Sequence, residues 1–218
     1  MEQRDLSCNK KEQYLKWTIV ILSLAIAALV TGFFAWKSGL LVQAQIQEHL
    51  AQEVLRFHIL ANSDSERDQS LKITVRDQVL DYLESEMPKA LDVMEAKRWM
   101  RRHVDELEAL SRETVAANGY DYPVTAAVTT CWFPDKTYGD VTFPAGNYEA
   151  LRIEIGDAQG HNWWCVLYPN LCFLDAANMV VPEESKIKLQ NVLTEEEYAQ
   201  ITTADFHIKS YFMEQWKK

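Results

Sequence analysis

The strongest pattern along the chain is an uninterrupted apolar run near the N-terminus. Residues 17–36, WTIVILSLAIAALVTGFFAW, contain no charged side chain, and Lys16 and Lys37 stand directly on either side of them. At about 1.5 Å per residue a helix of this length spans roughly 30 Å, the thickness of a bilayer core. A tryptophan at each end fits the aromatic belts of membrane interfaces. The run therefore predicts a membrane-targeting helix.

Two fates remain open for this helix. An uncleaved signal anchor fits its length, because the apolar regions of signal peptides are usually shorter. A cleaved signal peptide fits the small-x-small sequence VQA at residues 42–44. In both cases the basic flank, residues 1–16, stays in the cytoplasm and the part after the run is exported. We expect a linker over residues 37–53 and an exported domain over residues 54–218.

Helical spacing of apolar residues follows a first predicted strand at residues 54–60. One helix should run to about Glu86, where Pro88 stops it, and a second should cover about residues 90–117, ending at Asn118–Gly119. Two pairs could cap the start of the first helix, Ser63 with Glu66 or Ser65 with Asp68.

The hydrophobic period then changes from helical to alternating. Strands are predicted at residues 123–132, 148–156, 162–169 and 205–216, with a capped helix start at Thr194 before the last of them. Helices that are separated along the chain from a series of strands favour an α+β domain, in which an antiparallel sheet packs with two long helices.

Composition and charge narrow the class of partner. The chain is 48% hydrophobic and 25% charged, as in ordinary globular proteins. Four of the 22 Lys and Arg and three of the 32 Asp and Glu precede the apolar run, so the exported part has a formal charge near −11. Phosphate backbones are bound by clustered basic residues, so we expect no nucleic-acid partner.

Histidine, cysteine and tryptophan stand together in GHNWWCVLYPNLCF, residues 160–173. His161 and Cys165 suggest a nucleophile with its base, but side chains four residues apart on a strand lie about 13 Å apart. Only a histidine from another strand, such as His58 or His207, could come closer. An envelope hydrolase that uses Cys165 is therefore an alternative function rather than the favoured one.

Metal ligation has no supporting pattern. The sequence contains no C-x-x-C, no H-E-x-x-H and no close pair of histidines, so the ligand spacing of zinc sites is missing. The carboxylates Asp64 and Asp68 flank a helix start, where capping explains them. We expect no metal and no cofactor.

Three cysteines, Cys131, Cys165 and Cys172, lie in the exported part. A turn at residues 168–171 could bring two of them together on adjacent strands, but only a four-residue loop places the Cα atoms within the about 4.4 to 6.8 Å that a disulfide requires. Three states remain open: a disulfide between Cys165 and Cys172, two buried thiols, or a bond that involves Cys131.

Two stretches could serve either packing or recognition. On a strand Trp163 and Trp164 point to opposite faces, so both are buried or one is an exposed interface anchor. The stretch NSDSERDQ at residues 62–69 is either a solvated helix cap or a contact surface that continues to Arg76 and Asp77. A basic cluster, KRWMRRH at residues 97–103, is typical of a solvated helix face.

Two long stretches carry a family resemblance. LRFHILANSDSERDQSLKITVRDQVLDYLE at residues 55–84 and PAGNYEALRIEIGDAQGHNWWCVLYPNLCFLD at residues 144–175, followed by LTEEEYAQI, resemble the stage II sporulation protein R family of endospore-forming bacteria. The resemblance departs at Pro169–Asn170, where members commonly have two prolines, so the turn there can differ in type.

The resemblance implies a signalling protein without catalysis of its own. Such a protein is made in the forespore and exported across the inner forespore membrane, either anchored there or released into the intermembrane space. It triggers a membrane-embedded aspartic protease of the mother cell, which then cleaves pro-sigma-E. A purely structural, membrane-anchored envelope protein is a further alternative. The side chains that we expect to contact the partner are Arg56, His58, Asn62, Ser63, Asp64, Asp68, Arg76, Asp77, His161, Asn162, Trp163 and Trp164.

Overall fold

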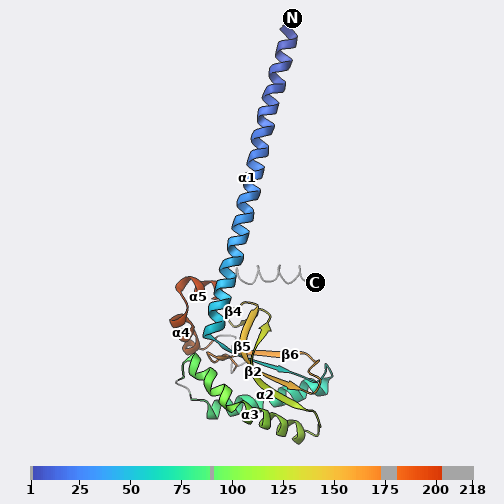
Figure 1. Ribbon diagram of the computed structural model, residues 1–218, viewed down its shortest axis with the longest axis vertical. Coiled ribbons are helices and arrows are strands. Elements are labelled where there is room, and N and C mark those ends of the chain that lie inside the picture. The colour runs from blue at the N-terminus through green and yellow to red at the C-terminus, as the bar shows by residue number, and fades with distance from the viewer. Residues whose placement is uncertain (1, 89–90, 173–180, 203–218) are drawn as a thin grey trace. The chain divides into compact units, whose positions relative to one another are not determined.

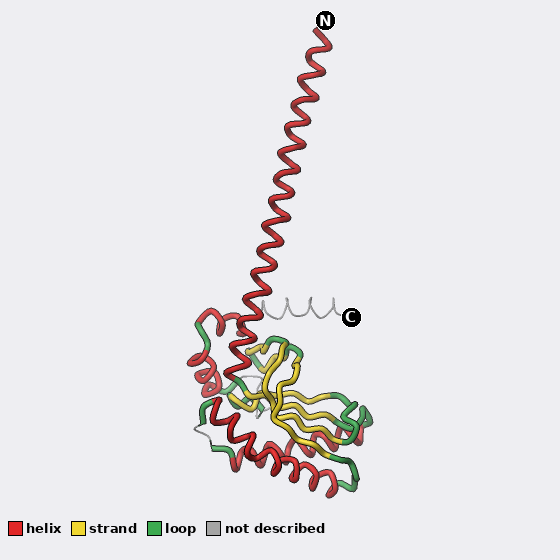
Figure 2. The backbone as a smooth tube through the Cα atoms, in the orientation of Figure 1, coloured by secondary structure: helices red, strands yellow, loops and turns green. Residues whose placement is uncertain are grey.

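The computed structural model describes residues 2–88, 91–172 and 181–202, and the chain divides into two compact units, Met1–Gln45 and Ile46–Lys218 (Figures 1 and 2). His207 and the strand predicted at residues 205–216 lie outside the described residues. Each unit is described by itself below.

A single helix, α1 (Glu2–Glu53), contains the apolar run. Its segment Lys16–Glu53 is long and apolar enough to cross a membrane by length and composition, with a mean hydropathy of 2.4 over its most apolar stretch. The structure differs from the expected linker, because residues 37–53 are helical. Ile46 and Leu50, 3% and 0% exposed, belong to the core of the second unit. The core thus begins eight residues before the expected domain boundary, since apolar residues one helical turn apart form a stripe that can pack.

The second unit is built on a four-stranded sheet with the order β2-β5-β1-β6. The sheet is mixed rather than antiparallel. β1 (Leu55–Leu60) runs parallel to β5 (Gly146–Ile155), whereas β6 (Asn162–Tyr168) and β2 (Val124–Phe133) are antiparallel to their neighbours. The prediction of an antiparallel sheet was wrong. Strands that follow one another in the sequence, such as β5 and β6, were expected to pair, but β1 lies between these two and runs parallel to β5.

Helices α2 (Glu66–Glu86) and α3 (Val93–Ala117) cover one face of this sheet (Figure 1). The side chain of Ser65 caps α2 by accepting a hydrogen bond from the backbone N–H of Asp68. At the start of α3, Asp92 and Glu95 form a reciprocal capping box. The apolar faces of α2 and α3 pack on alternate residues of β1, namely Leu55, Phe57 and Ile59.

A second core lies on the opposite face. The last turns of α1, the short strands β3 (Lys136–Tyr138) and β4 (Val141–Phe143), and helices α4 (Glu183–Val192) and α5 (Glu195–Thr202) contribute to it. At its centre Arg56 is 0% exposed and holds its guanidinium carbon 4.1 Å from the centroid of the Phe133 ring. It donates a hydrogen bond to the Tyr138 hydroxyl at 3.0 Å. Both faces of β1 are therefore covered, which is why all six of its residues are buried.

After β6 the chain makes a turn, and the described residues that follow form no further strand. The Tyr168–Pro169 peptide bond is cis, and the N–H of Leu171 donates to the Val166 carbonyl at 2.9 Å. This turn brings Cys165 and Cys172 together in a disulfide with a Cα–Cα distance of 5.3 Å. Cys131 remains a free thiol.

Candidate partner-binding surface

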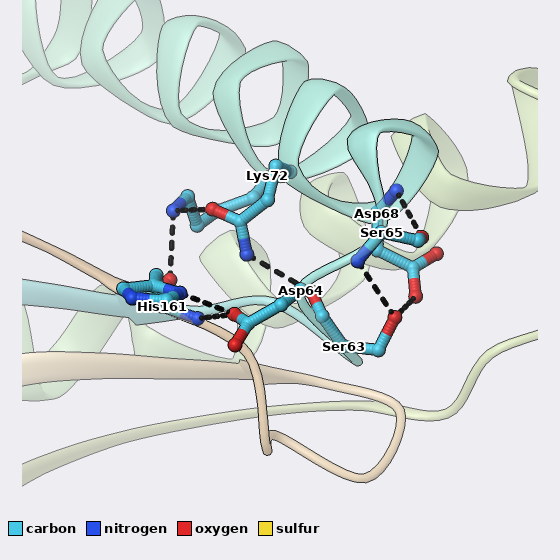
Figure 3. A network of polar contacts seen from close by, with 7 residues as sticks. Ser63, Asp64, Ser65, Asp68, Lys72 and His161 are labelled. Atoms are coloured by element: carbon cyan, nitrogen blue, oxygen red, sulfur yellow. Dashed lines mark hydrogen bonds and ion pairs between the residues drawn. The ribbon is translucent and has the colours of Figure 1, made fainter.

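Two loops meet at one end of the sheet, where β1 and β5 end and β6 begins (Figure 3). The backbone N–H of Gly160 donates to the Ala61 carbonyl at 2.9 Å, and that of Gln159 donates to the Asn62 carbonyl at 3.2 Å. The Asn62 side chain accepts a further bond from the N–H of Asp157 at 2.9 Å. These bonds hold the β1–α2 loop against the β5–β6 loop, two segments that are about a hundred residues apart in sequence.

A buried carboxylate organises the first of these loops. Asp68, 5% exposed, accepts hydrogen bonds from the Ser63 hydroxyl at 2.5 Å, the Asn62 amide at 2.9 Å and the Tyr122 hydroxyl at 3.2 Å. The bond from Ser63, followed by those from Asn62 and Tyr122, holds the pKa of Asp68 below its usual value against the opposing effect of burial. Asp68 therefore stays ionised and fixes the loop from inside.

Lys72 links the helix to both loops. Its ammonium donates to the Gln69 side chain at 2.6 Å and to the His161 carbonyl at 2.7 Å (Figure 3). Gln69 in turn donates to the Ser63 carbonyl at 2.9 Å. Lys72 is only 4% exposed, and this burial lowers its pKa. A charged group in such a place must be hydrogen-bonded, so the contacts with Gln69 and His161 are needed for the fold.

Asp64 and His161 form an exposed pair above this network. One carboxylate oxygen of Asp64 accepts from the backbone N–H of His161 at 2.6 Å and lies 2.5 Å from its ring Nδ1. These two bonds lower the pKa of Asp64. Both side chains remain accessible, with exposed fractions of 57% and 79%. The pair thus presents polar groups in a fixed position, which suits recognition.

Trp163 extends the surface along the outer strand β6. Its ring packs edge-on against the Phe57 ring, with 5.5 Å between the two centroids. The guanidinium carbon of Arg76 lies 5.1 Å from the centroid of the Trp163 ring. Arg76 also donates to Asp77 at 2.8 Å. Stacking of this kind restricts a long arginine side chain, so less conformational freedom is lost when a partner binds.

Trp164 points to the opposite face. Its ring stacks on the imidazole of His58 at 3.8 Å and lies 4.7 Å from the ring of Phe133. Burial lowers the pKa of His58 to about 4, so its imidazole is neutral at physiological pH. The two tryptophans are thus both half-buried, each on its own face of the sheet.

The structure separates the twelve expected contact residues by exposure. Arg56, His58 and Asp68 are buried, so they can position other residues but offer no direct contact on this surface. We define the loop surface as six residues at the joined loops and along the adjoining edge of β6 and α2: the exposed Asp64, Asp77, His161 and Asn162 and the half-buried Arg76 and Trp163. Asn62, Ser63 and Trp164 are half-buried beside it.

Four residues outside the twelve expected contact residues organise this surface: Gln69, Lys72, Tyr122 and Gly160. A lysine among the apolar positions of a predicted helix was a usable signal for Lys72, since it lies one residue after Leu71 and three before Val75. Gly160 had no such signal. A Cβ atom there would overlap the backbone carbonyl of Ser63, so the close approach of the two loops requires glycine.

Within the described part of the domain, the cysteines do not pair a nucleophile with a base. Cys165 is held in the disulfide, and the free Cys131 has its sulfur 3.9 Å from Nδ1 of His58. Burial raises the pKa of Cys131 and lowers that of His58, so this pair is a neutral thiol beside a neutral imidazole. A catalytic cysteine requires the opposite shifts. Among the described residues no group of three or more His, Cys, Asp or Glu side chains could hold a metal ion.

Sequence comparison supplies the family. The profile of a family described as Stage II sporulation protein R (spore_II_R) matches residues 51–178, more than half of the chain. The chain belongs to the stage II sporulation protein R family. Its matched region includes the loop surface and all four strands of the sheet.

A curated member of the stage II sporulation protein R family gives the same result. The stage II sporulation protein R of Bacillus subtilis (strain 168) is 38% identical over 139 residues, which cover 64% of this chain and 62% of that protein. The chain thus spans less than two thirds of the length of that relative. The comparison with solved structures found no match to the present chain.

Proposed function

We propose that this chain is the intercompartmental sporulation signal that activates a membrane-embedded aspartic protease, which then cleaves pro-sigma-E. The observation that carries the proposal is membership of the stage II sporulation protein R family. In this proposal α1 crosses or is inserted at the inner forespore membrane, and the domain from Ile46 onward lies in the intermembrane space, either anchored or released.

The loop surface supports activation by binding rather than by catalysis. Its exposed groups are held in place by buried ones, since Asp68 and Lys72 fix the two loops that carry Asp64 and His161. A preorganised surface loses little conformational entropy on association. Trp163 beside Arg76 adds two of the residue types that are enriched at interface hot spots. We propose that the exported face of the protease binds here.

Co-expression tests the signalling function itself. The full chain, the protease and pro-sigma-E are expressed together in a non-sporulating host, and cleavage of pro-sigma-E is followed by immunoblotting. Cleavage should depend on the presence of the chain. Full cleavage without the chain would exclude the signalling role and favour a structural envelope protein.

A further inference from the structure

The first half of α3 carries a basic face that the proposed function does not use. Met94, Arg98, Arg101 and Arg102 are exposed, and their spacing places them on one side of the helix. We call these four residues and the nearby Trp132 the α3 basic patch. Trp132 lies on β2 and is 56% exposed. It pairs with Asn147 of β5, two residues before Glu149, and Glu149 forms an ion pair with Arg101.

Two of the three arginines are unpaired within the part of the chain that the structure describes. Arg101 contacts Glu149, whereas Arg98 and Arg102 have no carboxylate within ion-pair distance there. The same arginines line a hollow of about 420 Å³ together with Leu91, Trp99 and Glu95. The patch therefore combines free positive charge, apolar side chains and a concave surface in a domain whose overall charge is strongly negative.

The patch lies close to the point where α1 enters the domain. Lys97, on the same turns of α3, donates to the backbone carbonyl of Gln52 at 2.8 Å and to that of Ala51 at 3.4 Å. Gln52 follows Trp36, the end of the apolar run, by only sixteen residues in the sequence. The chain thus tethers the patch at short range from any membrane that holds the apolar run, which raises its effective concentration there.

The patch and the loop surface lie at opposite ends of α2. Asp64 and Asp68 are at the N-terminal end of α2, whereas its C-terminal end connects within a few residues to the start of α3. The 21 residues of α2 span about 32 Å. A contact between the patch and a membrane would accordingly hold the loop surface well away from the lipid.

We infer that the α3 basic patch binds the anionic lipid headgroups of the membrane into which α1 inserts, and that this contact orients the domain. Arginines provide the charge attraction and the planar donors that fit phosphate, while the exposed Trp132 and Met94 suit the interfacial region. This inference does not depend on the proposed protease partner.

The test uses the full chain in nanodiscs with a fluorescent probe at Met94→Cys, in a background of Cys8→Ser and Cys131→Ser. Quenching by spin-labelled lipid is compared between phosphatidylcholine discs and discs with about one third phosphatidylglycerol. Quenching should be strong only with the anionic lipid and should fall at high salt. A probe at the exposed Ser70→Cys, near the loop surface, should stay unquenched in both.

Matched substitutions make the test specific to the patch. Each arginine near an anionic leaflet contributes about fivefold to binding, so Arg98→Gln with Arg102→Gln should lower the ratio of quenched to unquenched protein by roughly 25-fold. Arg112→Gln, which removes an exposed arginine from the same helix, should have no such effect. The inference would be overturned by equal quenching in neutral discs, by no quenching in either kind of disc, or by an equal effect of Arg112→Gln. Loss of quenching on addition of inorganic phosphate at constant ionic strength would also overturn it and would indicate a site for free phosphate.

Discussion

The carboxylate of Asp68 accepts three side-chain hydrogen bonds under the loop surface, and its removal should loosen that surface from inside. Asp68→Asn turns an acceptor into a partial donor and leaves the Ser63 hydroxyl or the Tyr122 hydroxyl without its partner. We expect the free energy of unfolding to fall by about 1 to 3 kcal/mol, measured by urea unfolding of the full chain in detergent with tryptophan fluorescence. Asp77→Asn, on an exposed residue, should change it little; equal effects would contradict this role for Asp68.

The same residue predicts a pH dependence. Because hydrogen bonds lower the folded-state pKa of Asp68, its stabilisation is present above the unfolded value of about 3.9 and is lost as the pH falls through the folded value. Between about pH 5 and pH 3 the wild-type chain should therefore lose stability more steeply than Asp68→Asn. Parallel curves of unfolding free energy against pH for the two proteins would show that Asp68 does not titrate in this way.

At the residue scale, sequence patterns identified the cap but not the buried charges. Two capping pairs were predicted as alternatives because such interactions are local, and the structure forms the bond from the Asp68 N–H to the Ser65 hydroxyl. The burial of Arg56 could not be predicted, since it depends on Phe133 and Tyr138, which approach from elements about eighty residues away. Lys72 is similar, because its partner carbonyl belongs to His161.

At the scale of elements, the disulfide that closes the turn after β6 should be structural. Its two cysteines are seven residues apart, and for a loop of this size the disulfide contributes about 2 kcal/mol. Cys165→Ser and Cys172→Ser should thus lower stability and signalling to the same extent, and the double variant should be no worse than either. If Cys165→Ser alone abolished activity while Cys172→Ser retained it, a nucleophilic role for Cys165 would be supported instead.

The last turns of α1 should behave as part of the domain. Leu50 is fully buried in the second core, so Leu50→Ala should lower the free energy of unfolding of the domain by about 2 to 5 kcal/mol. Glu48→Ala, on an exposed position two residues earlier, is the control. The measurement is again urea unfolding, and a Leu50→Ala variant as stable as the control would restore the linker interpretation of these residues.

Hydrophobic periodicity identified most elements but not their arrangement. It located α2, β2, β5 and β6 to within a few residues, because each has its own period and its own turn signals. It could not order the strands, since β1 enters between β5 and β6, which follow one another in the sequence. The strands β3 and β4 are three residues each, too short to show a period.

At the scale of the whole molecule, the chain combines a helix that is apolar and long enough to cross a membrane with an α+β domain that we propose to be exported. Our proposal that the domain works by contact outside the cytoplasm is supported by its family and by its disulfide. In our proposals the α3 basic patch would face lipid and the loop surface would face the protein partner.

The most direct test of this account is cleavage of pro-sigma-E by the co-expressed protease in the presence of loop-surface variants. Trp163→Ala and the double variant Asp64→Ala with His161→Ala should each reduce cleavage at least tenfold, as expected when an interface hot spot worth about 2 kcal/mol is lost. Ile187→Ala, an exposed apolar residue on α4, should leave cleavage unchanged, and resistance to proteolysis should show that all variants are folded. Normal cleavage with both folded loop-surface variants would contradict the proposal that this surface binds the protease.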